Sequence, residues 1–269
     1  MGTQMVFKRY EIKYRMTCRQ QTAILRAMEA HMQADEYGIS SIRNIYYDTP
    51  DFRLIRTSME KPVYKEKLRL RGYGARSGAD EVFLELKKKY RDVVYKRRIA
   101  MPYQQVCEAL SGIRPLPDSQ IGREISYAME YYRTLRPAVF LSYDRIAYFE
   151  RGGGDFRVTF DRNIRFRQEE LTLDSDAHGT PLLRADEVLM ELKTDGAIPL
   201  WMVRALSAQG VSKTSFSKYG TAYQIITQQS KGVATYVTVP IATDRKEFFI
   251  YGKRFCKKER QKVVRTLLH

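Results

Sequence analysis

The sequence predicts an α+β protein: an antiparallel β-barrel that forms a tunnel with a charged lumen, with helices packed on the outside. Extended segments recur along most of the chain, and helical segments lie between them, which is the pattern of an α+β fold. Charged and apolar residues alternate within the extended segments, and Arg, Lys and Glu dominate the polar positions. The hydrophobic fraction is 43%, with 19 Tyr and 12 Phe, which indicates an ordered globule with a sizeable core.

The first two elements follow from local patterns. Residues 6–15 alternate in polarity, as a half-buried strand does. Thr17 and Gln20 have the spacing of a capping box, which predicts a helix from there to about Met32. The apolar stripe of this helix comprises Ile24, Leu25 and Met28.

The middle of the chain is expected to contain two strands, a charged hairpin and two helices. The strands lie near 42–48 and 63–73 and, in the hairpin, at 81–89 and 93–101. Gly72, Gly74 and Gly78 mark the turn before the hairpin. Pro102 opens a helix that Gly112 closes, because proline is favoured at a helix start. A second helix is expected from Ile121 to about Thr134.

The later elements repeat this mixture. Strands are expected near 138–149, 155–167 and 187–194, the first two joined by a hairpin turn at 152–154. Helices are expected at 199–209 and 218–230. After about residue 231 the pattern weakens, although 235–241 is compatible with a strand. We therefore expect one large domain, residues 1–230, followed by a basic C-terminal tail, residues 231–269.

Sorting each strand by face gives rows of charge. Lys65, Lys67, Arg69 and Arg71 point to one side, because alternate residues of a strand share a face. Comparable rows are Arg9, Glu11, Lys13 and Arg15; Phe83, Glu85 and Lys87; Tyr143 and Arg145; Asp155, Arg157, Thr159 and Asp161; and Glu191 and Lys193. A sheet with one wet side explains any single strand. The density of charge in the whole set favours a closed barrel, in which carboxylates offset the cations and can bind a divalent metal.

A series of short segments carries a family resemblance. They are Arg9-Tyr-Glu-Ile-Lys13, Tyr46-Tyr-Asp48, Lys67-Leu-Arg-Leu-Arg71, Glu85-Leu-Lys87, Lys96-Arg-Arg98, Ser142-Tyr-Asp-Arg145, Glu191-Leu-Lys193 and Ser215-Phe-Ser-Lys-Tyr219. In this order and spacing, over roughly residues 6–228, the chain resembles the triphosphate tunnel metalloenzymes (CYTH-like superfamily). The resemblance is closest to the vacuolar transporter chaperone (VTC) domain, a polyphosphate polymerase.

The resemblance implies a tunnel barrel and an activity. That activity is transfer of the γ-phosphate of ATP to a growing inorganic polyphosphate chain, assisted by a divalent metal, with Mn²⁺ favoured over Mg²⁺. The implied catalytic cations are Lys13, Arg69, Arg71, Lys87, Arg145, Arg157 and Lys218. The implied substrate contacts are Tyr143, Ser217, Lys96, Arg97 and Lys193, and the implied metal ligand is Glu191.

The chain departs from the wider superfamily at its first motif. Triphosphatases and cyclases of that superfamily begin with Glu-x-Glu-x-Lys, whereas Arg9 stands here in the first position, before Glu11 and Lys13. A cation in place of a metal carboxylate fits the polymerase branch better than the hydrolases. A tunnel-type inorganic tri- or polyphosphatase, or a nucleoside triphosphatase, remains the alternative enzyme.

The formal net charge of +16 predicts polyanionic partners. We expect ATP, inorganic polyphosphate and a pyrophosphate or phosphate primer, and the resemblance adds a membrane protein. A non-catalytic barrel that binds nucleic acid or another polyanion is the rival, but the interleaved Glu residues make nucleic acid a poorer match. Cys18, Cys107 and Cys256 lie far apart, and no apolar run reaches membrane-spanning length. A cytoplasmic protein is expected, associated with the inner face of a membrane through its partner.

Overall fold

The structure is a computed structural model that describes residues 10–91 and 93–234 of the chain. Its residues fall into two units, 1–222 and 223–269, which are described separately. In the second unit the described residues continue helix α6 (Lys218–Ala234), where the Thr227 hydroxyl donates to the Tyr223 carbonyl at 3.0 Å. Arg9, Cys256, the expected strand at 235–241 and most of the expected basic tail lie outside the described residues.

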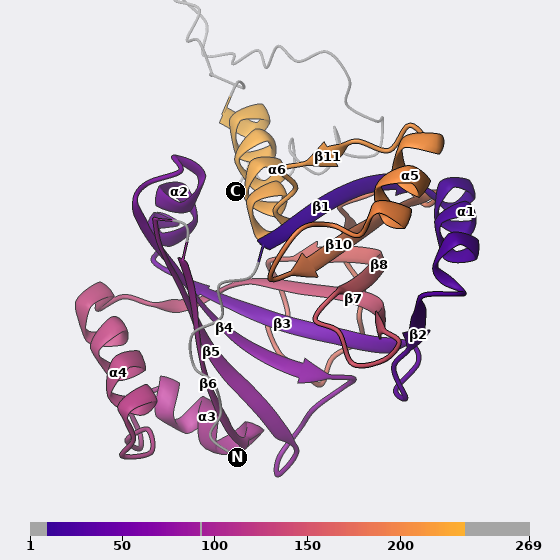
Figure 1. The fold of residues 1–269 in the computed structure, drawn as a ribbon. Helices are drawn as coiled ribbons and strands as arrows, with labels where there is room; N and C mark the ends of the chain where they lie inside the picture. Colours follow the sequence, from indigo (N-terminus) through magenta and orange to yellow (C-terminus); the bar gives the residue numbers. More distant parts are fainter. Residues whose placement is uncertain (1–9, 92, 235–269) are drawn as a thin grey trace, which may run out of the picture. The chain divides into compact units, whose positions relative to one another are not determined.

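One antiparallel sheet organises the first unit (Figure 1). Its strands run in the order β11-β1-β10-β8-β7-β3-β4-β5-β6, with β2 beside β7 and β9 beside β8. The strands are β1 (Tyr10–Thr17), β2 (Met32–Ala34), β3 (Ser40–Asp48), β4 (Tyr64–Tyr73), β5 (Glu81–Tyr90), β6 (Val93–Pro102), β7 (Arg136–Glu150), β8 (Arg157–Arg167), β9 (Thr180–Pro181), β10 (Glu187–Thr194) and β11 (Lys213–Thr214). The sheet curls so that one face becomes an interior.

The helices are α1 (Cys18–Met28), α2 (Arg53–Met59), α3 (Tyr103–Leu110), α4 (Gln120–Tyr132) and α5 (Leu200–Ala208), besides α6. On the outer face of the curled sheet, α1 and α5 form one group and α3 and α4 form another. Ile24 of α1 and Met202 of α5 pack with Met190 of β10 in one apolar core. Val106 of α3 and Ile125 of α4 belong to a second core, which includes the apolar face of β4 and β5. The expected α+β class, with helices outside an antiparallel tunnel, is confirmed.

The sheet is curled but not closed, in contrast to the closed barrel that we expected. In the described residues β6 and β11 are the two ends of the strand order and do not pair with each other. Side chains join the walls instead: Lys87 Nζ of β5 lies 3.6 Å from Glu11 Oε2 of β1. Alternation along a strand determines which residues face inward, but it does not determine whether the last strand meets the first.

Several local predictions are confirmed and some elements are new. The capping box of Thr17 and Gln20 is present, but α1 ends at Met28 because Met32–Ala34 pairs with β7 as a strand. The helix α2 was not expected. It begins after Phe52, which has a φ of 57° and makes no side-chain capping bond. The Arg53 amide donates instead to Thr49 Oγ1, and the next two amides donate to Asp48 at the end of β3.

Candidate active site

The inner face of β4 and β5 carries a cluster of cations around one carboxylate. Glu85 is 1% exposed, and Arg69 Nε and Arg98 Nε donate to its two oxygens at 2.7 and 2.8 Å. Lys96 Nζ also lies 2.8 Å from Glu85 Oε1. Burial by itself raises the pKa of Glu85, but Arg69, Arg71 and Lys96 outweigh it and hold that pKa far below its usual range. Glu85 is therefore ionised and fixes the neighbouring cations in place.

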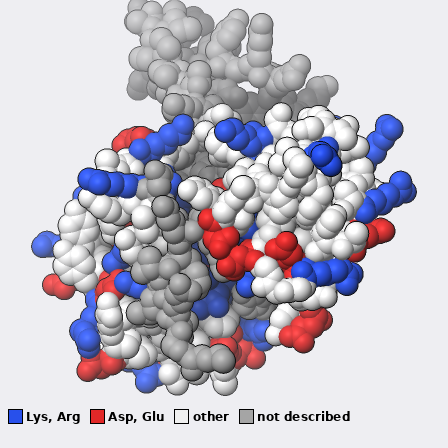
Figure 2. Space-filling view, in the orientation of Figure 1, with Lys and Arg blue, Asp and Glu red and all other residues white. Residues whose placement is uncertain are grey.

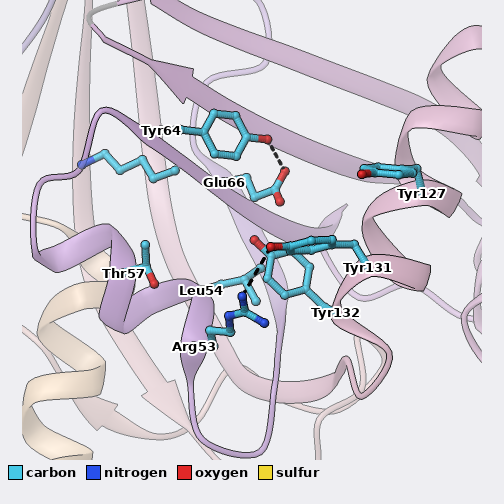
Figure 3. A pocket seen from close by; sticks show the side chains of 9 residues that line it. Arg53, Leu54, Thr57, Tyr64, Glu66, Tyr127, Tyr131 and Tyr132 are labelled. Carbon is cyan, nitrogen blue, oxygen red and sulfur yellow. Dashed lines mark hydrogen bonds between the residues drawn. The ribbon is translucent and has the colours of Figure 1, made fainter.

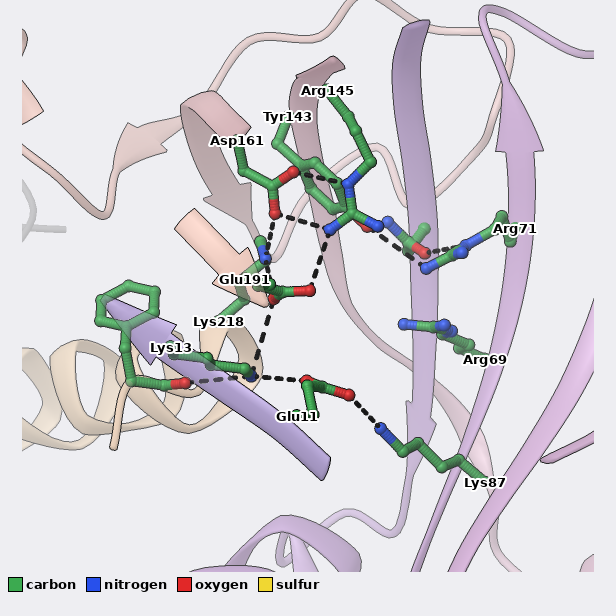
Figure 4. A network of polar contacts seen from close by, with 12 residues as sticks. Glu11, Lys13, Arg69, Arg71, Lys87, Tyr143, Arg145, Asp161, Glu191 and Lys218 are labelled. Atoms are coloured by element: carbon green, nitrogen blue, oxygen red, sulfur yellow. Dashed lines mark hydrogen bonds and ion pairs between the residues drawn. The ribbon is translucent and has the colours of Figure 1, made fainter. Parts of the chain in front are cut away.

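The opposite wall is built around a pair of carboxylates, Glu191 of β10 and Asp161 of β8 (Figure 4). Arg145 Nε donates to Asp161 Oδ1 at 2.6 Å, and Arg145 Nη2 donates to Glu191 Oε2 at 3.3 Å. Lys218 Nζ lies 2.5 Å from Asp161 Oδ2 and 3.1 Å from Glu191 Oε1. Burial raises the pKa of Glu191, but Lys218, Arg145 and Lys13 lower it well below the usual range. Both carboxylates are shared by the same two cations.

Charged side chains of β1 connect the two walls. Lys13 Nζ lies 3.7 Å from Glu191 Oε1 and 3.3 Å from Glu11 Oε1, and it donates to the Phe216 carbonyl at 3.2 Å. Glu11 in turn approaches Lys87, as described above. Burial raises the pKa of Glu11, but Lys87 and Lys13 lower it to about 2. An unbroken network of ion pairs thus crosses the interior from β10 to β5.

Aromatic and amide groups position the guanidinium groups of the interior. Arg71 donates to Asn44 Oδ1 at 3.0 Å and to the Tyr143 hydroxyl at 3.2 Å. The Arg145 guanidinium and Lys218 Nζ lie over the Tyr143 ring, 5.1 and 4.7 Å from its centre, which is a cation–π geometry. These contacts hold the charges in fixed directions before any ligand binds.

Two interior lysines differ from the rest because they form no ion pair with a described carboxylate. Burial lowers the pKa of Lys67 to about 8, and Lys87 and Lys13 add to this effect. Burial and then Arg145 lower the pKa of Lys193 to about 8. Near Lys67, the Tyr46 hydroxyl accepts from Arg69 Nη1 at 3.1 Å. Burial raises the Tyr46 pKa, but Arg69 and Lys67 outweigh it and bring that pKa to about 8. Positive charge is in excess here and favours an anionic ligand.

Most residues selected from the sequence meet in this interior. They are Lys13, Arg69, Arg71, Lys87, Lys96, Tyr143, Arg145, Glu191, Lys193 and Lys218. Arg157 has the matching alternation but is exposed at the start of β8. The Ser217 hydroxyl accepts from the Gly220 amide at 3.2 Å, so it caps the start of α6.

The prediction that Arg97 contacts the substrate is wrong. Arg97 lies on the opposite face of β6, where its Nε donates to Glu124 of α4 at 3.0 Å. The neighbouring Arg98 faces inward, because it pairs in register with Glu85. Sequence reasoning also did not assign a role to Glu85, Asp161, Lys67 or Tyr46, although alternation already placed the first three on the charged face.

The carboxylate pair suits a divalent metal that is shared with a substrate. Magnesium-type ions commonly take one or two carboxylates and complete their shell with phosphate oxygens and water. Glu191 and Asp161 supply such hard oxygen donors on one wall. No group of three or more His, Cys, Asp or Glu side chains in the described residues forms a metal site alone. The donor set therefore fits an ion held by these two carboxylates together with phosphate.

A separate cavity of about 300 Å³ lies between α2, α4 and the start of β4 (Figure 3). It is lined by Arg53, Leu54, Thr57, Tyr64, Lys65, Glu66, Tyr127, Tyr131 and Tyr132. Arg53 lies 5.5 Å from the ring centres of Tyr131 and Tyr132, and the Tyr64 hydroxyl donates to Glu66 at 2.7 Å. Four of the nine lining residues are tyrosines, and the two cations Arg53 and Lys65 lie beside Glu66, so the cavity lacks the concentration of positive charge found in the interior.

Comparisons with known proteins agree with this architecture. A family model described as the VTC domain matches residues 8–227. A candidate adenylate cyclase from Bacillus halodurans has a similar structure, with a TM-score of 0.50 and 14% identity over 79% of this chain and 95% of that chain. A candidate adenylyl cyclase from Hippeastrum, described as having a dominant triphosphatase activity, gives a TM-score of 0.47 and 16% identity over 78% of this chain and 92% of that one. No curated protein matched the sequence.

Proposed function

Because this chain belongs to the VTC domain family, we propose that it is a polyphosphate polymerase that transfers the γ-phosphate of ATP to a growing inorganic polyphosphate chain. One observation supports this most directly: the curled sheet encloses rows of cations that outnumber the carboxylates among them. ATP and polyphosphate both carry closely spaced negative charge, which such rows neutralise. On the face shown in Figure 2, by contrast, acidic side chains lie among the basic ones, which suits an open nucleic-acid groove less well.

Phosphoryl transfer requires positioning and charge neutralisation more than covalent chemistry. Arg69 and Arg71 on β4 present planar groups that match phosphate oxygens, and Lys13 and Lys87 supply compact charges. When substrate binds, Lys218 and Arg145 give up some of their ion pairs with Asp161 and Glu191 and contact substrate oxygens instead. The acceptor phosphate is already an anionic nucleophile, so we assign no general base.

Family membership implies a divalent metal, and Glu191 with Asp161 would hold it. When bound, such an ion neutralises charge on the phosphate oxygens. Our preference for manganese over magnesium is part of the proposal. None of the helices in the described part of the chain has the length and apolar character needed to cross a bilayer. A cytoplasmic location beside a membrane protein partner remains a prediction.

A tri- or polyphosphatase, or a nucleoside triphosphatase, is the second candidate. One observation favours it: Tyr46, with a pKa of about 8, lies at the Arg69 end of the interior and could accept a proton from an attacking water. Hydrolysis requires such a group, whereas transfer to a phosphate acceptor does not.

The deciding experiment is incubation of purified protein with ATP and Mn²⁺, followed by a gel stained for polyphosphate and a parallel assay of free phosphate. Polyphosphate together with ADP supports the polymerase. Free phosphate without polymer indicates the hydrolase. The absence of turnover combined with salt-dependent binding of polyphosphate would reduce the proposal to a polyanion-binding role.

A further inference from the structure

A second group of arginines lies on the outer face of the sheet, away from the interior cations. Gly72 of β4, Arg43 of β3, Ser142 of β7 and Arg165 of β8 are paired in register and form one row across four strands. Their sequence neighbours Arg71, Asn44 and Tyr143 face inward, so this row faces outward. Arg76 packs over Gly72, where an added Cβ would lie 2.8 Å from Arg76 Cγ. We call Arg43, Arg76, Ser142 and Arg165 the outer arginine row.

Three polar atoms of the outer arginine row are buried without a hydrogen-bond partner: Arg43 Nε, Arg76 Nε and Ser142 Oγ. Buried groups of this kind are rare, and each costs about 1–3 kcal/mol when it is left unsatisfied. No described carboxylate forms an ion pair with Arg43, Arg76 or Arg165. Asp174 interacts electrostatically with Arg43 without forming an ion pair with it, so the row keeps an excess of positive charge beside three polar atoms that lack a partner.

The segment 169–179 binds the guanidinium groups of Arg43 and Arg165 and the backbone amide of Arg76. Arg43 Nη1 donates to the Leu173 carbonyl at 3.1 Å and also to the Ser175 carbonyl. The Arg76 amide donates to the same Leu173 carbonyl at 3.2 Å, so the two arginines converge on Leu173. Arg165 Nη1 donates to the Gly179 carbonyl at 3.2 Å. The backbone thus accepts from Arg43 and Arg165, whereas the Nε–H groups of Arg43 and Arg76 have no hydrogen-bond partner.

We propose that the outer arginine row is a second anion site, which binds a tetrahedral oxyanion such as inorganic phosphate through Arg43 Nε, Arg76 Nε and Ser142 Oγ. Guanidinium N–H groups and a hydroxyl are the donors that phosphate oxygens accept, and the ligand's charge offsets that of the arginines. Residues 169–179 border the row, so we take its ligand to be a small free anion and not a polymer or a lipid headgroup. The site lies on the opposite face from Arg71 and Tyr143 and does not depend on the proposed polymerase activity.

The test uses the full chain and measures binding of inorganic phosphate by equilibrium dialysis and by thermal melting, both without and with long-chain polyphosphate added to occupy the interior. Ser142→Ala and Arg76→Lys, which remove one donor each, should weaken phosphate binding about tenfold, or by roughly 1.4 kcal/mol. Arg162→Lys, an outer-face change outside the row, is the matched control and should bind phosphate normally.

Two results would overturn the proposal. If the site holds only water, Ser142→Ala removes an unsatisfied hydroxyl, so the melting temperature stays the same or rises while the response to phosphate is unchanged. If sodium chloride at equal ionic strength stabilises the protein as much as phosphate does, the effect is general screening and not an oxyanion site.

Discussion

Glu191 and Asp161 together neutralise Lys218 and Arg145, so the loss of either carboxylate changes the charge of the whole wall. Glu191→Gln should abolish metal-dependent turnover while leaving the fold intact, because an uncharged amide is a weak ligand for a hard divalent ion. Synthesis of polyphosphate over a range of Mn²⁺ concentrations, with circular dichroism as the fold check, measures this. Glu124→Gln on the outer face is the control, and normal turnover of Glu191→Gln would refute the assigned role.

Arg97 and Arg98 are adjacent arginines on opposite faces of β6 and form a matched pair. Arg98→Ala should weaken polyphosphate binding by about tenfold or more, because a charge-assisted contact contributes about 1.5–3 kcal/mol. Arg97→Ala loses a partly exposed pair with Glu124 and should cost at most about 1 kcal/mol of stability, with unchanged affinity. Binding isotherms and urea melts of both variants test this, and equal losses of affinity would contradict the placement of Arg98.

The titration of Lys67 and Tyr46 should determine how the affinity for polyphosphate depends on pH. Both have a pKa of about 8, so raising the pH from 7 to 9 removes the positive charge of Lys67 and adds a negative charge on Tyr46. The dissociation constant for polyphosphate should therefore rise over this interval. The free energy of unfolding should also rise over this interval, because the unfolded chain binds more protons than the folded one at these pH values. Lys67→Met should flatten the binding profile, and a profile identical to that of the unchanged protein would argue against Lys67 as its source.

The alternation of charged and apolar residues along the strands predicted which face most of these side chains lie on, but it did not predict their roles. The run Lys96-Arg97-Arg98 is basic at every position, so its pattern cannot show which residues face inward; the register with β5 decides it. Asp161 and Glu85 were placed on the charged face, yet their importance depends on how many cations from other strands reach them, and one strand's sequence does not contain that information.

Among the elements, α2 depends on a carboxylate outside its own sequence. Asp48 accepts from the amides of Leu54 and Ile55 at 2.8 and 3.0 Å and from the Tyr219 hydroxyl at 2.8 Å. Asp48→Ala leaves these donors unsatisfied and should lower the unfolding free energy by about 3 kcal/mol. Thr17→Ala, which removes the exposed cap of α1, should cost only about 1 kcal/mol. Urea denaturation compares the two variants, and equal losses would mean that Asp48 acts as an ordinary cap.

Elements with a long, regular pattern were predictable from the sequence. Very short elements, and a helix capped by residues outside it, were not. The hairpin of β5 and β6 and the helices α3 and α4 lie within a few residues of their expected positions. The strands β9 and β11 contain two residues each, too few for a period to show. The helix α2 is capped by Asp48 and Thr49, which precede it across a turn, so no capping pattern directly adjoins it in the sequence.

In the first unit as a whole, the interior has more cations than carboxylates, and a bound polyanion would neutralise the excess positive charge. Tripolyphosphate should therefore raise the melting temperature, and at a hundred times its dissociation constant it adds about 2.7 kcal/mol of stability. Differential scanning calorimetry of the full chain measures the shift, and sodium sulfate at matched ionic strength is the control. Equal stabilisation by sulfate would indicate screening in place of occupancy of the interior.

The curled architecture was predictable from the sequence, but its closure was not. Inward rows on successive strands require a concave charged surface, and the structure has one. Whether β6 meets the first strands depends on twist and strand count, which no single segment determines. The observed sheet relies on pairs such as Glu11 with Lys87 where a closed barrel would use backbone hydrogen bonds.

An open sheet leaves β6 at one end of the strand order, with backbone groups that could pair with another molecule. Lys96, Arg97 and Arg98 place like charges along this edge, so two copies repel each other when they approach edge to edge. Arg97, turned outward, is already paired with Glu124, so a bound polyanion that neutralises Lys96 and Arg98 weakens most of this repulsion. Solubility and ligand binding are therefore linked through one strand.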